Sequence, residues 1–151
     1  MAETKNAEWT ADSMYALGMR HATAEAEGDL DETMATLVDE PVYEFWPMGK
    51  RMVGTDAVLR YYEHLVSDFM PAQIGYEMIA ETVSPEALSQ EYVIRLKGEN
   101  GGEPQSFRVL GILFAADDGS GLMGGERIWG SDAFLRRMIG PIWDELESIE
   151  G

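Results

Sequence analysis

The stretch Glu91-Tyr-Val-Ile-Arg-Leu-Lys97 places Tyr92, Ile94 and Leu96 on one face of an extended chain and mostly charged residues on the other. This alternation is typical of an antiparallel strand with one buried and one wet face. Residues 74–81 alternate in the same way, with Tyr76 and Met78 on the apolar side. The two segments predict neighbouring strands of one sheet.

Further strands follow along the chain. Residues 107–115 are apolar almost throughout, as expected of a central strand, and residues 122–129 predict the last long strand. Turn-forming stretches at residues 98–104 and 117–121, rich in Gly, Asp and Asn, separate them. The second half of the chain is therefore predicted to form a sheet of three or four long antiparallel strands.

The first half carries helical signals instead. Thr10 is the predicted N-cap of a first helix that stops at Gly28. Asp29 is the predicted cap of a second helix, which carries Leu37 and Val38 on its inner face and ends at Pro41. An α+β fold, with the helices packed on a sheet, is the expected class.

Shorter elements complete the predicted order. Residues 42–46 and 50–53 form a small strand pair, and residues 55–69 form a third helix. A final helix over residues 133–139 starts after Ser131 and Asp132, and an amphipathic tail follows at residues 141–151. Residues 1–9 are expected to be flexible. No linker or repeat interrupts residues 1–151, so one domain accounts for the chain.

Composition excludes several classes of partner. The formal net charge of −17 argues against nucleic acid and anionic membrane surfaces, because both require a surplus of Lys and Arg. Apolar runs are far shorter than the roughly 20 residues that cross a bilayer. No signal peptide is visible and there is no cysteine, so a cytoplasmic protein is expected. Two histidines without ligand spacing predict no metal site, and we expect no cofactor.

The order of elements carries a family resemblance together with five short motifs. These are Gly28-Asp-Leu-Asp31, Val38-Asp-Glu40, Gly54-Thr55, Tyr61-Tyr62 and Glu126-Arg-Ile-Trp129. In order and spacing the chain resembles the nuclear transport factor 2-like superfamily, and within it the SnoaL-like polyketide cyclases and ketosteroid isomerases. The resemblance implies a cone-shaped, curved antiparallel sheet with N-terminal helices enclosing an apolar pocket, a cystatin-like roll. It also implies a homodimer formed through the outer face of the sheet.

The resemblance transfers few functional residues of the isomerases. Their first pocket tyrosine falls at His21, their general-base aspartate at Phe45 and their protonated aspartate near Gly111. Phe45 and Gly111 cannot transfer a proton, so steroid isomerisation by that mechanism is not expected. A second pocket tyrosine is retained as Tyr62 and a tryptophan as Trp129.

His21 is the main catalytic candidate from the residues themselves. It stands on the otherwise apolar face of the first helix, where burial would lower the pKa of its imidazole and leave a neutral base or proton shuttle. Tyr62 is its predicted partner by resemblance. The alternative is a core histidine that is satisfied by that tyrosine or by a backbone carbonyl.

Three further candidates lie near the end of the last strand. Arg127 alternates with Trp129 and Ser131, so all three share one face, and Arg127 would stabilise an oxyanion if that face is the cavity. The alternative is a rim arginine paired with an acid. The acid of the cyclase relatives falls at Ser131 with Asp132 beside it, although both are also natural helix caps.

The predicted pocket lining is apolar and aromatic, and the same residues are equally compatible with ordinary core. Its members are Leu17, Tyr43, Phe45, Tyr76, Met78, Tyr92, Trp129 and Ser131. The predicted function is binding of a small hydrophobic molecule of polyketide, steroid or terpenoid type, with cofactor-free cyclisation, isomerisation or hydration. The alternatives are a non-catalytic binding or dimeric assembly module, and the small subunit of an aromatic-ring dioxygenase.

Overall fold

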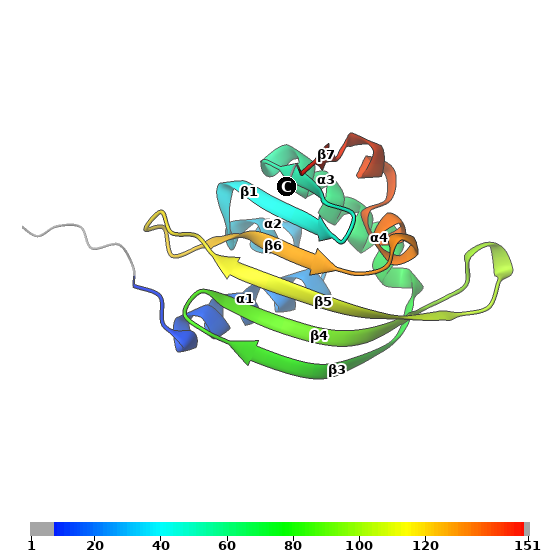
Figure 1. Cartoon of the computed structure of the whole chain (residues 1–151), viewed down its shortest axis with the longest axis horizontal. Coiled ribbons are helices and arrows are strands. Elements are labelled where there is room, and N and C mark those ends of the chain that lie inside the picture. Colours follow the sequence, from blue (N-terminus) through cyan, green and yellow to red (C-terminus); the bar gives the residue numbers. More distant parts are fainter. Residues whose placement is uncertain (1–7, 150–151) are drawn as a thin grey trace, which may run out of the picture.

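The computed structural model of the chain describes residues 8–149, which form one curved seven-stranded sheet with helices against it (Figure 1). The strands are β1 (Leu37–Trp46), β2 (Lys50–Val53), β3 (Gln73–Val83), β4 (Ala87–Leu96), β5 (Gln105–Ala115), β6 (Met123–Trp129) and β7 (Glu147–Ser148). The α-helices are α1 (Ala11–Ala26), α2 (Leu30–Ala35), α3 (Thr55–His64) and α4 (Asp132–Ile139).

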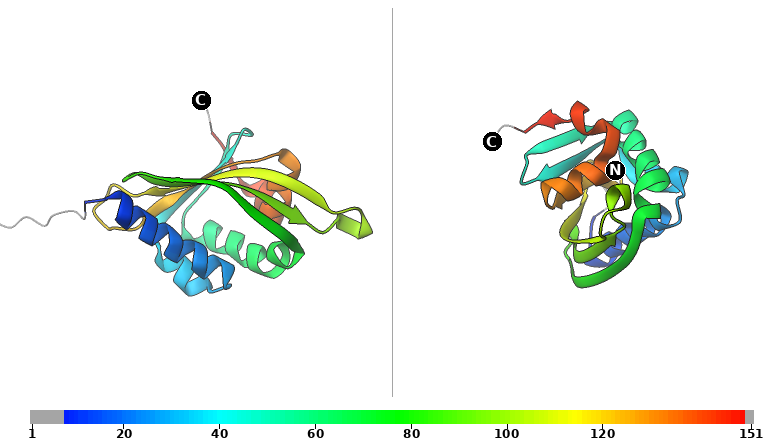
Figure 2. Two further views of the ribbon diagram at one scale, coloured as in Figure 1. Left: turned by 90° about the horizontal axis from the view of Figure 1, so that it is seen from below. Right: turned by 90° about the vertical axis from the view of Figure 1, so that its right-hand side faces the viewer.

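The strands lie in the order β3-β4-β5-β6-β1-β2-β7, and only β1 and β6 pair in parallel. Helices α1, α2 and α3 all lie on the concave face of the sheet (Figure 2). This is the predicted α+β class with the predicted antiparallel pairing of β3, β4, β5 and β6. Residues from both halves of the chain therefore meet in one core.

The first helix forms where its signals predict. Ser13 N donates to the Thr10 side chain at 3.0 Å, and the chain turns at Gly28 with a φ of 72°. A Cβ at Gly18 would lie 2.5 Å from Leu88 Cδ2, so the glycine lets α1 approach β4 closely. As a result, the inner face of α1, which includes His21, packs on the sheet.

The second helix is shorter than predicted. It ends at Ala35, and Leu37 and Val38 already belong to β1, which runs through Pro41. The pairing of β1 with β6 is irregular between Leu37 and Val42, and a proline without an N–H fits such an interruption. Pairing with a strand about 85 residues away thus overrides the local helical pattern.

Other boundaries also differ from the prediction. The third helix is α-helical only to His64 and continues as a π-helical turn over Leu65–Phe69. Strand β3 is one edge of the sheet and is exposed on both faces. Tyr76 and Met78 are therefore 51% and 38% exposed and do not face a closed interior. An edge strand has a neighbour on one side only, which leaves its side chains less covered.

The ends of the described chain are packed. Trp9 Nε1 donates to the Ala116 carbonyl at 2.9 Å, so Trp9 is anchored, while residues 1–7 of the predicted flexible segment lie outside the described residues. In the predicted tail, Gly140–Glu145 forms a 3-10 turn that buries Ile142 and Trp143, and β7 pairs with β2. Within residues 8–149, no helix is long and apolar enough to cross a membrane.

Candidate functional site

A cavity of about 650 Å³ lies between the concave face of the sheet and the helices. Its wall is largely apolar and aromatic, with one cluster of ionisable groups. The lining residues that matter for its chemistry are His21, Glu25, Tyr61, Tyr76, Tyr92 and Glu126. The cavity thus joins α1, α3 and strands β3, β4 and β6 in one site.

His21 is held from behind by the end of α2. Its Nδ1 lies 2.7 Å from Thr36 Oγ1, and the Thr36 hydroxyl donates to the Thr33 carbonyl at 2.6 Å. Because that hydroxyl proton is already committed, Thr36 Oγ1 can only accept from the imidazole. Nδ1 therefore carries a proton, and the ring is fixed with Nε2 directed at the cluster.

Glu126 reaches the cavity because of an irregularity in β6. Gly125 has a φ of 146°, and a Cβ there would lie 1.8 Å from the Val42 carbonyl oxygen. The pairing of β6 with β5 also shifts register at this point. This β-bulge turns Glu126 and Ile128 toward the inside of the sheet.

Two tyrosines complete a hydrogen-bonded chain behind Glu126. The Tyr62 hydroxyl donates to Glu126 Oε2 at 3.0 Å and accepts from the Tyr43 hydroxyl at 2.5 Å. His21 Nε2 lies 2.9 Å from the Tyr62 hydroxyl and 3.0 Å from Glu126 Oε2. Since the Tyr62 proton is committed to Glu126, both contacts require a proton on Nε2. The hydrogen bonds therefore describe a doubly protonated imidazolium.

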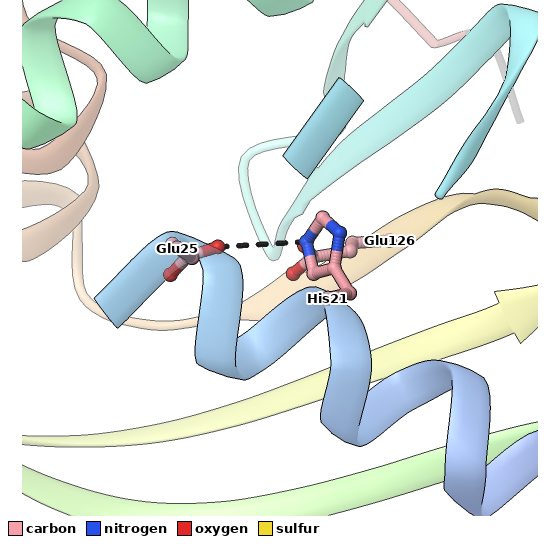
Figure 3. Close-up of side chains that lie close together, drawn as sticks. All are labelled: His21, Glu25 and Glu126. Atoms are coloured by element: carbon pink, nitrogen blue, oxygen red, sulfur yellow. Dashed lines mark hydrogen bonds and ion pairs between the residues drawn. The ribbon is translucent and has the colours of Figure 1, made fainter. Parts of the chain in front are cut away.

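Glu25 adjoins the same ring from four residues after His21 on α1 (Figure 3), and it lines the cavity. Its Oε2 is 3.5 Å from His21 Nε2, and its side chain is 33% exposed. One ligand atom each from His21, Glu25 and Glu126 lie within 4.8 Å of one another, which is a spacing that could hold a divalent cation. A metal would have to replace the proton on Nε2, so the hydrogen bonds favour the ion-paired cluster.

Electrostatics support the imidazolium. Burial alone lowers the pKa of His21, but the hydrogen bond to Glu126, the close contact with Glu25 and the negative charges of both carboxylates raise it to about 9. The sequence-based expectation of a neutral imidazole is therefore wrong. The reason is that two carboxylates adjoin the ring, and neither was among the predicted site residues.

The tyrosines of the site stay protonated. Burial raises the pKa of Tyr43, Tyr61, Tyr62 and Tyr92 well above the ordinary value, and the negative charges of Glu25 and Glu126 raise it further. A phenol that keeps its proton is a hydrogen-bond donor to any oxygen that carries developing negative charge.

The structure brings together three of the predicted pocket and catalytic residues at the cavity wall: His21, Tyr76 and Tyr92. Tyr62 lies one layer behind and contacts His21, as the resemblance predicted. Tyr43 and Phe45 are fully buried and pack against Tyr61 and Tyr62, so they belong to the core, as does Leu17. The catalytic roles themselves stay predictions.

The remaining predicted residues do not line the cavity. Arg127 and Trp129 project from the outer face of β6, where Arg127 lies 3.8 Å from Glu44 and Trp129 stacks on Trp46. Met78 lies on the exposed edge strand and is also not part of the wall.

The two predicted residues after β6 serve the final helix. Ser131 caps α4 by accepting from Phe134 N at 3.1 Å. Asp132, on the first turn, pairs with Arg136 at 2.7 Å. Of the alternatives weighed from the sequence, the arginine paired with an acid and the Ser131 cap are observed, whereas Asp132 is the first residue of α4 and does not cap it.

Sequence reasoning missed the two carboxylates of the site. Glu25 could have been found, because a residue four positions after His21 lies on the same side of a helix. Glu126 was placed opposite Arg127 by simple alternation along the strand, and only the pair Gly124-Gly125 signals the bulge that brings it inside.

No protein-family model and no curated protein matches the chain in sequence. Solved structures match its fold. A nuclear transport factor 2-like protein from Burkholderia xenovorans LB400 matches with a TM-score of 0.65 at 9% identity, over 87% of this chain and 99% of that one. A protein with a cystatin-like fold from Silicibacter pomeroyi DSS-3 has a TM-score of 0.63 at 14% identity, over 84% of both chains.

A candidate ketosteroid isomerase from Kribbella flavida DSM 17836 matches with a TM-score of 0.61 at 13% identity, over 93% of both chains. These likenesses confirm the predicted fold, a nuclear transport factor 2-like, cystatin-like roll. At such low identity they show only the fold, and the chemistry of the site is inferred from the residues of this chain.

Proposed function

We propose that the cavity binds a small hydrophobic molecule and that Glu126, held by His21 and Tyr62, moves a proton on it. One observation carries this proposal. Glu126 uses Oε2 for both partners, whereas Oε1 accepts no hydrogen bond from any residue between 8 and 149. An oriented carboxylate with one free oxygen at the wall of an apolar cavity is suited to general-base catalysis.

The reaction class follows from what the site holds. Glu126 Oε1 would take a proton from a carbon next to a carbonyl group, and the electron pair of the broken C–H bond would move onto the carbonyl oxygen. Return of the same proton to another carbon completes an isomerisation without any co-reactant. The same first step also starts an intramolecular cyclisation.

Stabilisation of the enolate oxygen falls to phenols in this proposal. Tyr61 and Tyr92 line the cavity, and within the described chain their hydroxyl groups donate to no protein acceptor. Because their raised pKa keeps them protonated, either could donate to an oxyanion. They replace Arg127, Ser131 and Asp132, which lie outside the cavity.

Exchange of substrate protons with solvent tests the proposal directly. A hydrophobic cyclic ketone is incubated with the protein in D2O, and deuterium uptake beside the carbonyl is followed by NMR. Glu126→Gln should slow protein-dependent exchange by about 100-fold or more, the usual contribution of a general base. Asp132→Asn removes a carboxylate outside the cavity and should exchange like the wild type. Equal exchange by Glu126→Gln and the wild type would contradict the proposal.

A non-catalytic binding module is the second candidate. It is favoured by the internal hydrogen bonds of the network, because Tyr43, Tyr62, His21 and Glu126 Oε2 bond to one another without a ligand. The same experiment separates the two functions. Ketone binding without any protein-dependent deuterium uptake would support the module and exclude proton transfer.

Assembly and location remain proposals. We propose a homodimer through the outer face of the sheet, where Trp129 is 36% exposed beside Trp46. Sedimentation of the wild type against Trp129→Glu tests it, since a charge at that face should yield monomers. A cytoplasmic location and a role as a dioxygenase small subunit stay predictions of the sequence.

A further inference from the structure

The ionisable groups at the cavity wall are unbalanced in sign. Among the described lining residues, two carboxylates, Glu25 and Glu126, face one imidazolium, and no Lys or Arg takes part. The wall tyrosines stay neutral. An anionic ligand would meet excess negative charge in a poorly hydrated space, where charge repulsion is only weakly screened.

Glu25 is the less engaged of the two carboxylates. Glu126 is engaged by His21 and Tyr62 at 3.0 Å each, whereas the Glu25 carboxylate makes only the 3.5 Å contact to His21 and no hydrogen bond within residues 8–149. Figure 3 shows Glu25 reaching the imidazole from α1, while Glu126 comes from β6. With one third of its side chain exposed, Glu25 can accept from a ligand without giving up a protein partner.

Aromatic rings lie within the electrostatic reach of Glu25. Tyr76 and Tyr92 line the cavity with ring centroids 5.2 Å apart. Burial raises the pKa of Tyr92, and the charge of Glu25 is the next largest cause; the pKa of Tyr76 is raised by burial, then by the charge of Glu81 and then by that of Glu25. Ring faces attract cations, so the carboxylate and the rings favour the same kind of ligand.

We propose that the molecule bound in this cavity carries a protonated amine, which Glu25 binds, and that its apolar body lies against Tyr76 and Tyr92. This inference rests on the cavity-binding part of the proposed function and adds the chemical class of the ligand. The net charge of −17 acts in the same direction, because the field of the whole chain draws cations toward it.

Three probes of matched shape test the inference: naphthylmethylamine as the cation, naphthylmethanol as the neutral form and naphthoate as the anion. Their affinities for the full chain are measured by calorimetry at pH 7 and moderate salt. We expect the amine to bind at least about tenfold more tightly than the alcohol, because an ammonium forms an ion pair with the Glu25 carboxylate and a hydroxyl group does not. Naphthoate is expected to bind most weakly.

Two variants of equal charge locate the effect. Glu25→Gln should reduce amine affinity by about tenfold and change alcohol affinity much less, since it removes the ion pair while the amide oxygen still accepts from a hydroxyl group. Glu27→Gln removes the same charge at the exposed end of α1, outside the cavity wall, and should bind all three probes like the wild type.

Each other outcome is decisive. If the alcohol binds and the amine binds no better, or the anion binds best, the amine inference fails while cavity binding stands. If Glu27→Gln weakens the amine as much as Glu25→Gln does, the preference reflects overall charge and the assignment to Glu25 fails. If no probe binds the wild type, binding of small hydrophobic molecules fails as well, and the inference fails with it.

Discussion

His21 Nε2 lies 3.0 Å from Glu126 Oε2, although the two residues are 105 positions apart in the chain. One comes from the first helix and the other from the last long strand, so the contact exists only when the whole roll is closed. The ion pair therefore couples the stability of the fold to the integrity of the site.

This contact predicts a pH-dependent stability. The folded-state pKa of His21 is about 9, above the ordinary 6.5 expected in the unfolded chain. A raised pKa stabilises the fold fully below pH 6.5, and the contribution is lost as the pH rises toward 9. At 1.36 kcal/mol per unit of pKa, the contribution is on the order of 3 kcal/mol.

Urea denaturation of the wild type and of His21→Gln at pH 6, 8 and 10 measures it. The difference in free energy of unfolding between the two proteins should shrink as the pH rises from 6 to 10. Asp132→Asn, which does not touch the cluster, should follow the wild type. A difference that stays constant across this range would mean that His21 is not an imidazolium in the folded protein.

Loss of the Tyr62 hydroxyl should cost more than loss of the Tyr43 hydroxyl. Tyr62→Phe removes the donor to Glu126 and leaves the buried Tyr43 hydroxyl without its partner, which predicts a loss of about 1–3 kcal/mol. Tyr43→Phe removes only the donor to Tyr62. Because the hydroxyl groups bond to each other, the double variant should lose less than the sum. Additive losses in urea denaturation would contradict a connected network.

The sequence predicted the buried position of His21 because helical periodicity is a local property that the folded chain retains. Thr10 and Gly28 bound the first helix, and the apolar rhythm between them fixes which face is buried. The long strands were equally readable, because alternation and turn residues act locally. Tyr62 came from the family resemblance, since nothing in its local pattern separates a core tyrosine from a partner of His21.

The rest of the site depends on long-range irregularities. Simple alternation along β6 left open whether Arg127 or its neighbours face the cavity, and the bulge at Gly124-Gly125 decides for Glu126. The local pattern also predicted that the second helix ends at Pro41. Its place inside β1 follows from pairing with β6, which no local pattern reveals.

Arg127 should be dispensable for the chemistry. Its guanidinium lies over the Phe114 ring at 4.4 Å and 3.8 Å from Glu44, on a side chain that is 41% exposed. Exposed pairs of this kind contribute about 0–1 kcal/mol. Arg127→Gln should therefore change the free energy of unfolding by less than about 1 kcal/mol and leave deuterium exchange of a bound ketone at the wild-type rate. A large loss of deuterium exchange in Arg127→Gln would contradict this prediction and assign Arg127 a role in proton transfer.

Gly125 is predicted to be the least replaceable glycine of the site. Its φ of 146° is unfavourable for any side chain, and an added Cβ would overlap the Val42 carbonyl oxygen of the paired strand. Relief of that overlap requires β6 to move away from β1, which would withdraw Glu126 from His21 and Tyr62. Gly125→Ala should thus lose more than about 3 kcal/mol of stability.

The matched control for this prediction is Gly101→Ala. Gly101 also has a positive φ, 78°, but a Cβ there meets nothing within 4 Å, so only backbone strain of about 1 kcal/mol is expected. Thermal unfolding compares the stability of the two variants. Deuterium exchange of the ketone is then measured with the folded fraction of Gly125→Ala, and its rate reports on the position of Glu126. If Gly125→Ala costs no more than Gly101→Ala and exchanges normally, then the bulge is not what directs Glu126 into the cavity.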